Sequence, residues 1–290
     1  MKEYDVIIVG SGIAGMTAAI YLKRQNKNVL IIEKEVPGGQ LLQIPLIENY
    51  PGITEINGTD LALNLCDQIN KLEIPLIYEN VTKITMDKVI TTKNEYKSNY
   101  IVIATGRKPS KLGLENEDNL TGKGLSYCAT CDGPLYKGEI VAAIGSGSSA
   151  TTEALYLSNV CKKVYLICRK DKLKAEKILI DKILKKDNIE IIYNSSITKL
   201  NSKNDKLHSI ILNDKNELLI KGLFVFVGYE PNFKLSEDIK KINGYIKVNK
   251  SMQTNINNIY AIGDIIKKDV YQLTTAAAEA TICAEHINNN

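Results

Sequence analysis

The sequence contains little that would suit a metal site, a membrane span or a nucleic-acid interface. Of its 290 residues only two are histidines, His208 and His286, and only six are cysteines. No apolar run reaches the ~18 residues of a transmembrane helix. Lysines and glutamates are intermixed, and no basic cluster with neighbouring aromatic residues stands out, which argues against nucleic-acid binding. We therefore expect no membrane insertion and no nucleic-acid partner.

The N-terminus leaves no room for a signal peptide. Residues 1–5 lead directly into an apolar, β-branched run at residues 6–9, without the longer apolar core of a secretory signal. The expected location is therefore cytoplasmic, where structural disulfides are rare. The composition, with 44% hydrophobic and 24% charged residues and a net charge of +4, is that of a soluble globular protein. A chain of this length is long enough for two domains.

The strongest chemical signal is the Cys-Ala-Thr-Cys-Asp-Gly string at residues 128–133. A thiol attacks a disulfide as its thiolate, and Cys-x-x-Cys spacing lowers a thiol pKa from about 8.5 into the ~3.5–7.5 range. The pair Cys128 and Cys131 can also close into a small ring and reopen, which suits two-electron transfer. Asp132 follows the second cysteine directly and is placed to hold or deliver the proton that such exchange requires.

Two other interpretations of the cysteine pair stay open, a zinc knuckle and a chance spacing. Zinc needs four ligands, usually from a second Cys-x-x-Cys or a histidine pair. The two histidines are far apart, and the other cysteines are scattered, at Cys66, Cys161, Cys168 and Cys283. The pattern therefore favours redox chemistry over zinc, and we expect no metal.

Residues 6–33 carry a dinucleotide-binding fingerprint in its required context. An apolar run leads into the Gly-x-Gly-x-x-Gly turn at residues 10–15, a helix-period segment follows, and a second apolar run ends at Glu33. The first glycine permits the tight turn, the second lets the backbone approach a pyrophosphate, and the third lets helix and strand pack. Glu33 is placed to accept hydrogen bonds from a ribose hydroxyl. Both strands and the acid argue against a chance glycine-rich turn.

A second unit of the same kind begins at residue 140. Its apolar run meets the Gly-Ser-Gly-Ser-Ser-Ala turn at residues 145–150, and Cys168 stands where the first unit has Glu33. Basic residues in place of the acid suit a 2′-phosphate, hence NADPH. Candidate NADPH contacts are Gly145, Gly147, Ser148, Ser149, Arg169, Lys170 and Lys174. A Rossmann-like unit that keeps its shape without the nucleotide is the alternative.

Hydrophobic periodicity predicts the remaining elements. Residues 107–120, with a proline and many charges, read as a connector. The pattern predicts helices at 59–73, 174–187 and 272–287, and short strands at 76–78, 81–84 and 89–91.

The chain resembles the low-molecular-weight thioredoxin reductases over essentially its whole length. Besides the fingerprint and the redox string, the resemblance rests on residues 38–40, 48–52, 104–106, 228–232 and 263–264. It implies an α/β fold with two Rossmann-like dinucleotide-binding domains (three-layer ββα), the second inserted into the first. An FAD-binding domain would comprise residues 1–111 and 232–290. The inserted, NADPH-domain-like part, residues 112–231, would carry the redox disulfide.

The resemblance also implies a homodimer that reduces thioredoxin. Electrons would pass from FAD to the Cys128–Cys131 disulfide and then to the disulfide of thioredoxin. Cys131 would lie nearer the flavin, Cys128 would attack thioredoxin, and Asp132 would donate the proton. FAD contacts would fall on Gly10, Ser11, Gly12, Ile13, Ala14, Gly15, Glu33, Lys34, Gly39, Gln40, Leu41, Asn49, Val81, Ala104, Thr105, Gly106, Gly263, Asp264, Tyr271 and Gln272.

Departures from the family pattern bear on the electron donor. The usual His-Arg-Arg string with a further arginine is here Cys168-Arg169-Lys170 with Lys174, and an ammonium cannot copy the planar fork of a guanidinium. An arginine of the last helix is replaced by Tyr271. We therefore expect reduced ferredoxin as the donor, as in one subgroup of the family, and the mild basicity suits an acidic partner. The alternatives are an ordinary NADPH-dependent thioredoxin reductase and a non-enzymatic flavin/dithiol redox sensor.

Overall fold

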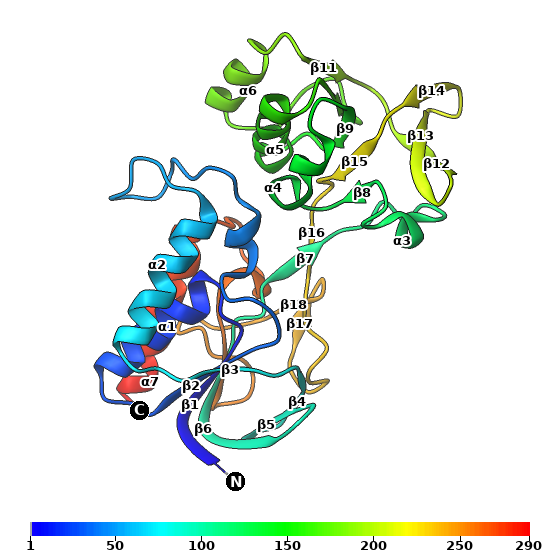
Figure 1. The fold of residues 1–290 in the computed structure, drawn as a ribbon. Helices are drawn as coiled ribbons and strands as arrows, with labels where there is room; N and C mark the ends of the chain where they lie inside the picture. The colour runs from blue at the N-terminus through cyan, green and yellow to red at the C-terminus, as the bar shows by residue number, and fades with distance from the viewer. Residues whose placement is uncertain (1) are drawn as a thin grey trace. The chain divides into compact units, whose positions relative to one another are not determined.

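The computed structural model describes residues 2–290, which form two compact α/β units (Figure 1). Unit 1 comprises the chain up to Leu42, Ile47–Lys108 and Glu230–Asn290, and unit 2 comprises Gln43–Leu46 and Pro109–Tyr229. Two short strands, β7 (Arg107–Pro109) and β16 (Tyr229–Pro231), pair where the chain passes between the units. The segment expected to be a plain connector thus contains β7 and a short helix, α3 (Glu117–Leu120).

Unit 1 is built on a seven-stranded sheet. Six strands follow the order β3-β2-β1-β6-β5-β4, and the seventh, β19, pairs with β6. The strands β1, β2, β3, β6 and β19 run parallel, whereas β5 pairs antiparallel with both β4 and β6. Strands covered on both faces read as continuous apolar runs, as at Val6, Ile7, Ile8 and Val9. The bounds are β1 Lys2–Val9, β2 Val29–Glu33, β3 Leu76–Tyr78, β4 Val81–Ile84, β5 Lys88–Thr91, β6 Glu95–Ile103 and β19 Ile259–Ala261.

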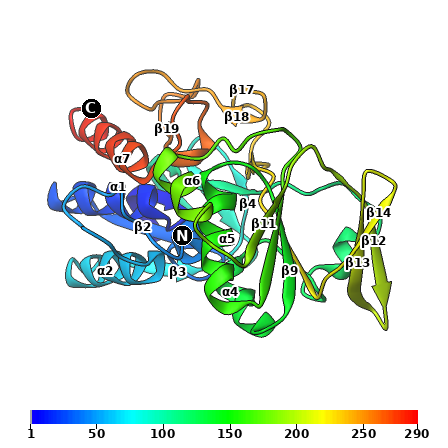
Figure 2. The same ribbon diagram turned by 90° about the horizontal axis from the view of Figure 1, so that it is seen from above.

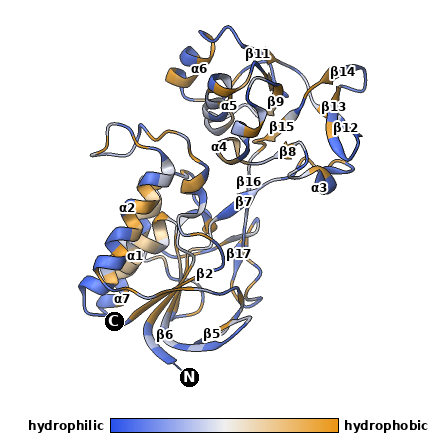
Figure 3. Cartoon of the chain, viewed as in Figure 1, coloured by the Kyte–Doolittle hydropathy of each residue, from blue (hydrophilic) through white to orange (hydrophobic). Residues whose placement is uncertain are grey.

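Three helices cover one face of this sheet: α1 (Ile13–Arg24), α2 (Gly58–Lys71) and α7 (Leu273–Asn288). Figures 1 and 2 show them side by side, with α1 in the middle. Along α2 hydrophobic and hydrophilic residues alternate (Figure 3). Its buried side chains, Leu61, Ala62 and Ile69, lie on the face that packs against the core. On the other sheet face, residues 233–256, with β17 (Lys241–Ile242) and β18 (Tyr245–Ile246), complete a three-layer core.

Unit 2 repeats the layered plan around a five-stranded parallel sheet of order β11-β10-β9-β15-β8. One face packs against α5 (Ser148–Val160) and the other against a three-stranded antiparallel sheet. The remaining bounds are β8 Leu125–Ser126, α4 Ala129–Asp132, η2 Gly133–Tyr136, β9 Ile140–Ile144, β10 Lys163–Ile167, α6 Lys177–Ile183, β11 Ile189–Ile192, β12 Ile197–Lys203, β13 Lys206–Leu212, β14 Asn216–Leu219 and β15 Gly222–Val225.

The helix predicted at residues 174–187 is shorter in the structure, where α6 spans only Lys177–Ile183. Two backbone groups at its predicted start are used elsewhere. The N–H of Lys174 donates to Ser146 O at 2.6 Å, and that of Glu176 donates to Ser148 Oγ at 3.2 Å. These bonds hold the segment against the glycine turn instead of letting it coil. Within residues 2–290 no helix is long and apolar enough to span a bilayer.

Candidate active site

The fingerprint turn joins β1 to α1 at the carboxyl edge of the unit 1 sheet. Gly10 has φ +107°, and a Cβ there would lie 2.5 Å from Ala104 O. A Cβ on Gly15 would lie 2.0 Å from Gly10 O, so both positions require glycine. A Cβ on Gly12, the N-cap residue of α1, would lie 4.0 Å from Gly38 O, and no side chain caps the helix. The turn therefore presents helix N–H groups to an anion such as a pyrophosphate.

Glu33 ends β2 beside this turn, and its carboxylate is held in place by four hydrogen bonds. Oε2 accepts from the Ser11 N–H at 2.9 Å and from Ser11 Oγ at 2.8 Å. Oε1 accepts from the N–H groups of Lys34 and Glu35 at 2.8 and 3.1 Å. A fixed acceptor at this place is what recognition of a ribose hydroxyl needs.

Three further segments converge on the fingerprint turn. The N–H of Gly38 donates to Ser11 O at 3.0 Å, and a Cβ on Gly39 would lie 3.5 Å from Gly12 Cα. Residues 104–106 follow β6, and a Cβ on Gly263 would lie 2.9 Å from Ala14 Cβ. The structure thus brings together most of the residues predicted to contact FAD. Farther out lie Val81, buried at the start of β4, and Asn49, whose Nδ2 donates to Gln272 Oε1 at 3.4 Å.

The residues at this edge fit a flavin dinucleotide. Thr105 Oγ1 is buried without a hydrogen-bond partner, and such a group in a native fold normally serves a ligand or water. The start of α1, which no side chain caps, suits phosphates. When bound there, FAD would supply a carrier of two electrons.

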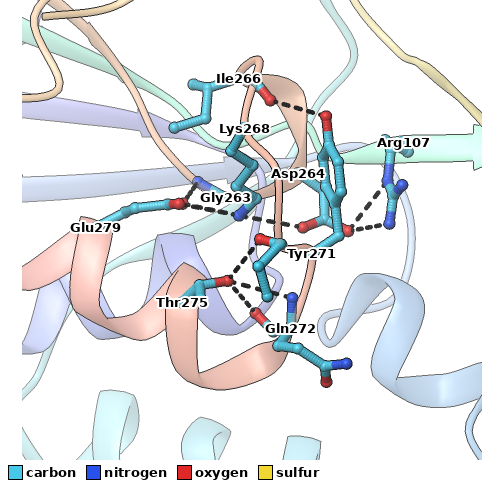
Figure 4. Close-up of polar contacts among 10 residues, drawn as sticks. Arg107, Gly263, Asp264, Ile266, Lys268, Tyr271, Gln272, Thr275 and Glu279 are labelled. Atoms are coloured by element: carbon cyan, nitrogen blue, oxygen red, sulfur yellow. Dashed lines mark hydrogen bonds and ion pairs between the residues drawn. The ribbon is translucent and has the colours of Figure 1, made fainter. Parts of the chain in front are cut away.

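A buried network of charges surrounds Asp264, next to these segments (Figure 4). Arg107 donates to Asp264 Oδ2 from Nε at 3.1 Å and from Nη2 at 2.7 Å. Lys268 Nζ lies 3.4 Å from Asp264 Oδ1 and 3.0 Å from Glu279 Oε2. Glu279 in turn accepts from the N–H of Gly263 at 2.9 Å. Burial raises the pKa of Glu279, although Lys268 opposes that shift.

Tyr271 closes this network at the start of α7. Its ring centroid lies 4.1 Å from Arg107 Cζ, and its hydroxyl donates to Ile266 O at 3.4 Å (Figure 4). Tyr271 is among the residues predicted from the sequence to contact FAD, whereas Arg107 is not. Its position in the sequence could have indicated Arg107. It directly follows Gly106, at the same edge of the sheet where Asp264 follows β19.

The redox cysteines lie in unit 2, where Cys128 and Cys131 form a disulfide with a Cα–Cα distance of 5.4 Å. The helix α4 closes the loop between them. Cys128 Sγ accepts from the Cys131 N–H at 3.1 Å, and Ser126 Oγ accepts from the Cys128 N–H at 3.0 Å. Cys128 is 8% exposed, whereas Cys131 is exposed. Asp132 is half-buried at the end of α4.

The second glycine turn keeps the geometry of a nucleotide site without its acid. A Cβ on Gly145 would lie 2.4 Å from Phe226 O, and Gly147 has open space. In the position of Glu33 stands the buried Cys168, which donates to Gly145 O at 3.3 Å. Burial raises the pKa of this thiol to about 11, so the site carries no negative charge there.

The basic side chains predicted near this turn, Arg169, Lys170 and Lys174, are exposed. Ser148 begins α5, and its hydroxyl accepts from the N–H of Glu176, as described above.

Within residues 2–290 no group of three or more His, Cys, Asp or Glu side chains is arranged to hold a metal ion.

Comparison with known proteins places this geometry in a family. The family model for pyridine nucleotide-disulphide oxidoreductases matches residues 4–280. The thioredoxin reductase of Ureaplasma parvum is 37% identical over 100% of this chain and 98% of its own length. A thioredoxin reductase structure from Lactococcus lactis superposes with a TM-score of 0.95 at 36% identity, covering 99% of this chain and 98% of that one.

A third similar structure carries a different name. The structure of a ferredoxin-flavin thioredoxin reductase from Clostridium acetobutylicum superposes with a TM-score of 0.55 at 31% identity, covering 100% of this chain and 98% of that one. The chain therefore belongs to the pyridine nucleotide-disulphide oxidoreductase family and is a flavoprotein of the low-molecular-weight thioredoxin reductase type.

Proposed function

We propose that this chain is an FAD-dependent reductase of thioredoxin. The observation that carries the proposal is the Cys128–Cys131 disulfide on α4 in a chain that also builds a dinucleotide cradle at Gly10–Gly15. The disulfide accepts two electrons and one proton, its S–S bond breaks, and one thiolate and one thiol result. The Cys128 thiolate then attacks the disulfide of thioredoxin to form a mixed disulfide, which the Cys131 sulfur resolves. Asp132 holds and returns the proton.

The cofactor contacts proposed for FAD are the residues predicted from the sequence, with Arg107 added as a residue that orients Asp264. The start of α1 holds the phosphates and Glu33 holds a ribose. In this proposal residues 1–111 and 232–290 are the FAD-binding domain, and residues 112–231 are the inserted domain. The active form is a homodimer in the cytoplasm.

For the electron donor we propose reduced ferredoxin, with NADPH as the second candidate. The buried Cys168 thiol in the acid position and the lysines that replace arginines support ferredoxin. The intact glycine turn at Gly145 supports NADPH, as do the names of the relatives, most of which are plain thioredoxin reductases. Anaerobic mixing with NADPH decides between them. Rapid bleaching of the flavin band at micromolar NADPH excludes the ferredoxin proposal.

Turnover tests the function itself. The holoenzyme is supplied with a competent donor and an excess of oxidised thioredoxin, and the new thiols on thioredoxin are counted. An enzyme produces many thiols per flavin, whereas a redox sensor reacts once and stops. A parallel assay with a low-molecular-weight disulfide in place of thioredoxin identifies the preferred substrate class.

A further inference from the structure

The helix α5 buries a carboxyl group that the proposed reaction does not use. Glu153 is only 7% exposed, and its Oε2 is buried without a hydrogen-bond partner. Its helix neighbours Ala150, Ala154 and Leu157 belong to an apolar core cluster. A carboxylate in such surroundings is strongly disfavoured, so a buried and unpartnered acid calls for a functional explanation.

The position of Glu153 relates it to the redox disulfide. A Cβ on Gly133, directly after Asp132, would lie 3.1 Å from Leu157 Cδ2 and 3.2 Å from Tyr156 Cε1. Glu153 stands three and four residues before Tyr156 and Leu157, so it lies on the same face of α5, one turn earlier.

At the start of α4, Ala129 belongs to the same buried cluster as Ala150 and Ala154. The α5 face that carries Glu153 therefore packs against α4, whose N-cap residue is Cys128. Glu153 is therefore on the helix face that supports the Cys-x-x-Cys turn.

Among residues 2–290, no charged group lowers the pKa of Glu153. Burial alone raises its pKa to about 8, so the carboxyl is protonated at neutral pH. The titratable groups on the elements packed against α5 are Asp132 on α4, Tyr136 on η2, Lys163 and Tyr165 on β10, and Lys177, Asp181 and Lys182 on α6. None of them donates a hydrogen bond to Glu153 Oε2.

We infer that Glu153, buried without a hydrogen-bond partner for Oε2 on the α5 face that packs against α4, is a positioning residue for the Cys128–Cys131 couple. The inference rests on the proposed function. When the disulfide accepts two electrons, the S–S bond breaks, one sulfur remains a thiolate, and the other binds the proton that Asp132 delivers. An ionised Glu153 would add a second negative charge in the same packed layer, and their repulsion would oppose reduction. Above about pH 8, opening the disulfide is therefore linked to proton uptake by Glu153.

The test measures the disulfide equilibrium directly and needs neither thioredoxin nor the natural donor. The holoenzyme is equilibrated anaerobically with mixtures of reduced and oxidised dithiothreitol between pH 6.5 and 9.5. Free thiols are trapped by alkylation, and the open fraction is read by mass spectrometry. In Glu153→Gln the side chain stays neutral at every pH. The reduction equilibrium constant of this variant should match wild type at pH 6.5 and exceed it by about tenfold at pH 9.5, the effect of one pKa unit of interaction.

The exposed Glu139, in the same unit, supplies the control. Glu139→Gln removes the same charge and should follow wild type at every pH. If Glu153→Gln does not fold, redox-difference infrared spectra of the wild type give a second measurement. At pH 9 reduction should add the C=O stretch of a protonated carboxyl, and Glu153→Asp should shift that band.

A constant ratio between folded Glu153→Gln and wild type across the pH range would overturn the inference, as would infrared spectra without a new carboxyl band. Either result leaves the proposed function standing, because the cysteines would still open and close. A disulfide that stays closed at every dithiothreitol ratio would instead contradict the proposed function, and this inference with it.

Discussion

The buried ion pair between Arg107 and Asp264 offers a direct perturbation of the cofactor edge. The two side chains are 15% and 18% exposed and share two hydrogen bonds of 3.1 and 2.7 Å. Hydrogen bonds to charged groups contribute about 1.5–3 kcal/mol. The cation–π contact with Tyr271 adds about 0.5–2 kcal/mol. Lys268, 3.4 Å from Asp264, still partners the carboxylate in Arg107→Ala, so the loss should stay near 2–3 kcal/mol.

The neighbouring residue on β7 provides a matched control. Lys108 pairs with Glu230 at 2.9 Å, but these side chains are 51% and 53% exposed. Exposed pairs contribute about 0–1 kcal/mol. Urea unfolding of Lys108→Ala should therefore show less than about 1 kcal/mol of destabilisation. Arg107→Lys keeps the charge but loses the planar fork and should fall between wild type and Arg107→Ala.

FAD titration of the same variants separates stability from cofactor binding. If Arg107 orients Asp264 for the cofactor, Arg107→Ala should weaken FAD binding by about tenfold, roughly 1.4 kcal/mol, and Lys108→Ala should leave it unchanged. The reasoning is refuted if Arg107→Ala unfolds and binds FAD like Lys108→Ala. That result would mean that the network around Asp264 contributes to neither stability nor cofactor binding.

Three further predictions concern the turn, the docking surface and the pH dependence. Gly15→Ala would place a Cβ 2.0 Å from Gly10 O, so the purified variant should be colourless, and a yellow, FAD-saturated variant would be inconsistent with the turn geometry. Leu135 is 78% exposed just beyond the redox turn; Leu135→Ala should raise the KM for thioredoxin several-fold while changing stability by less than about 0.5 kcal/mol, and an unchanged KM would show that thioredoxin docks elsewhere. The pKa of Glu153 rises from 4.5 to about 8 on folding, so the folded protein binds a proton that the unfolded chain releases between these pH values. The free energy of unfolding, measured in urea, should therefore fall as pH rises from about 4.5 to 8 and level off above 8. Glu153→Gln should flatten that slope, and an equal slope in both proteins would assign it to other groups.

The sequence was most informative where neighbouring residues alone decide the structure. The glycine spacing of residues 10–15 predicts a strand, turn and helix, and β1, α1 and β2 follow it because Gly10 and Gly15 admit no Cβ. The Cys-x-x-Cys spacing likewise allows a closed disulfide within one turn of α4.

Contacts between residues far apart in the sequence could not be predicted from local sequence patterns. Arg107 and Asp264 are separated by 157 residues and meet because β6 and β19 are neighbours in the sheet. The shortened α6 depends on bonds from Lys174 and Glu176 to a turn formed by a different segment. Glu153 lies in a helix rich in small residues, where the hydrophobic pattern does not mark the buried face.

The central claim is that electrons reach Cys128 and Cys131 through the flavin. The most direct measurement is an anaerobic single-turnover experiment in which the holoenzyme receives two electrons from its donor, and flavin absorbance and protein thiols are followed together. The account predicts that wild-type flavin bleaches and then recovers as two thiols appear, whereas Cys128→Ser and Cys131→Ser keep the flavin reduced. Recovery of the flavin without new thiols, or reduction of thioredoxin by either serine variant, would contradict it.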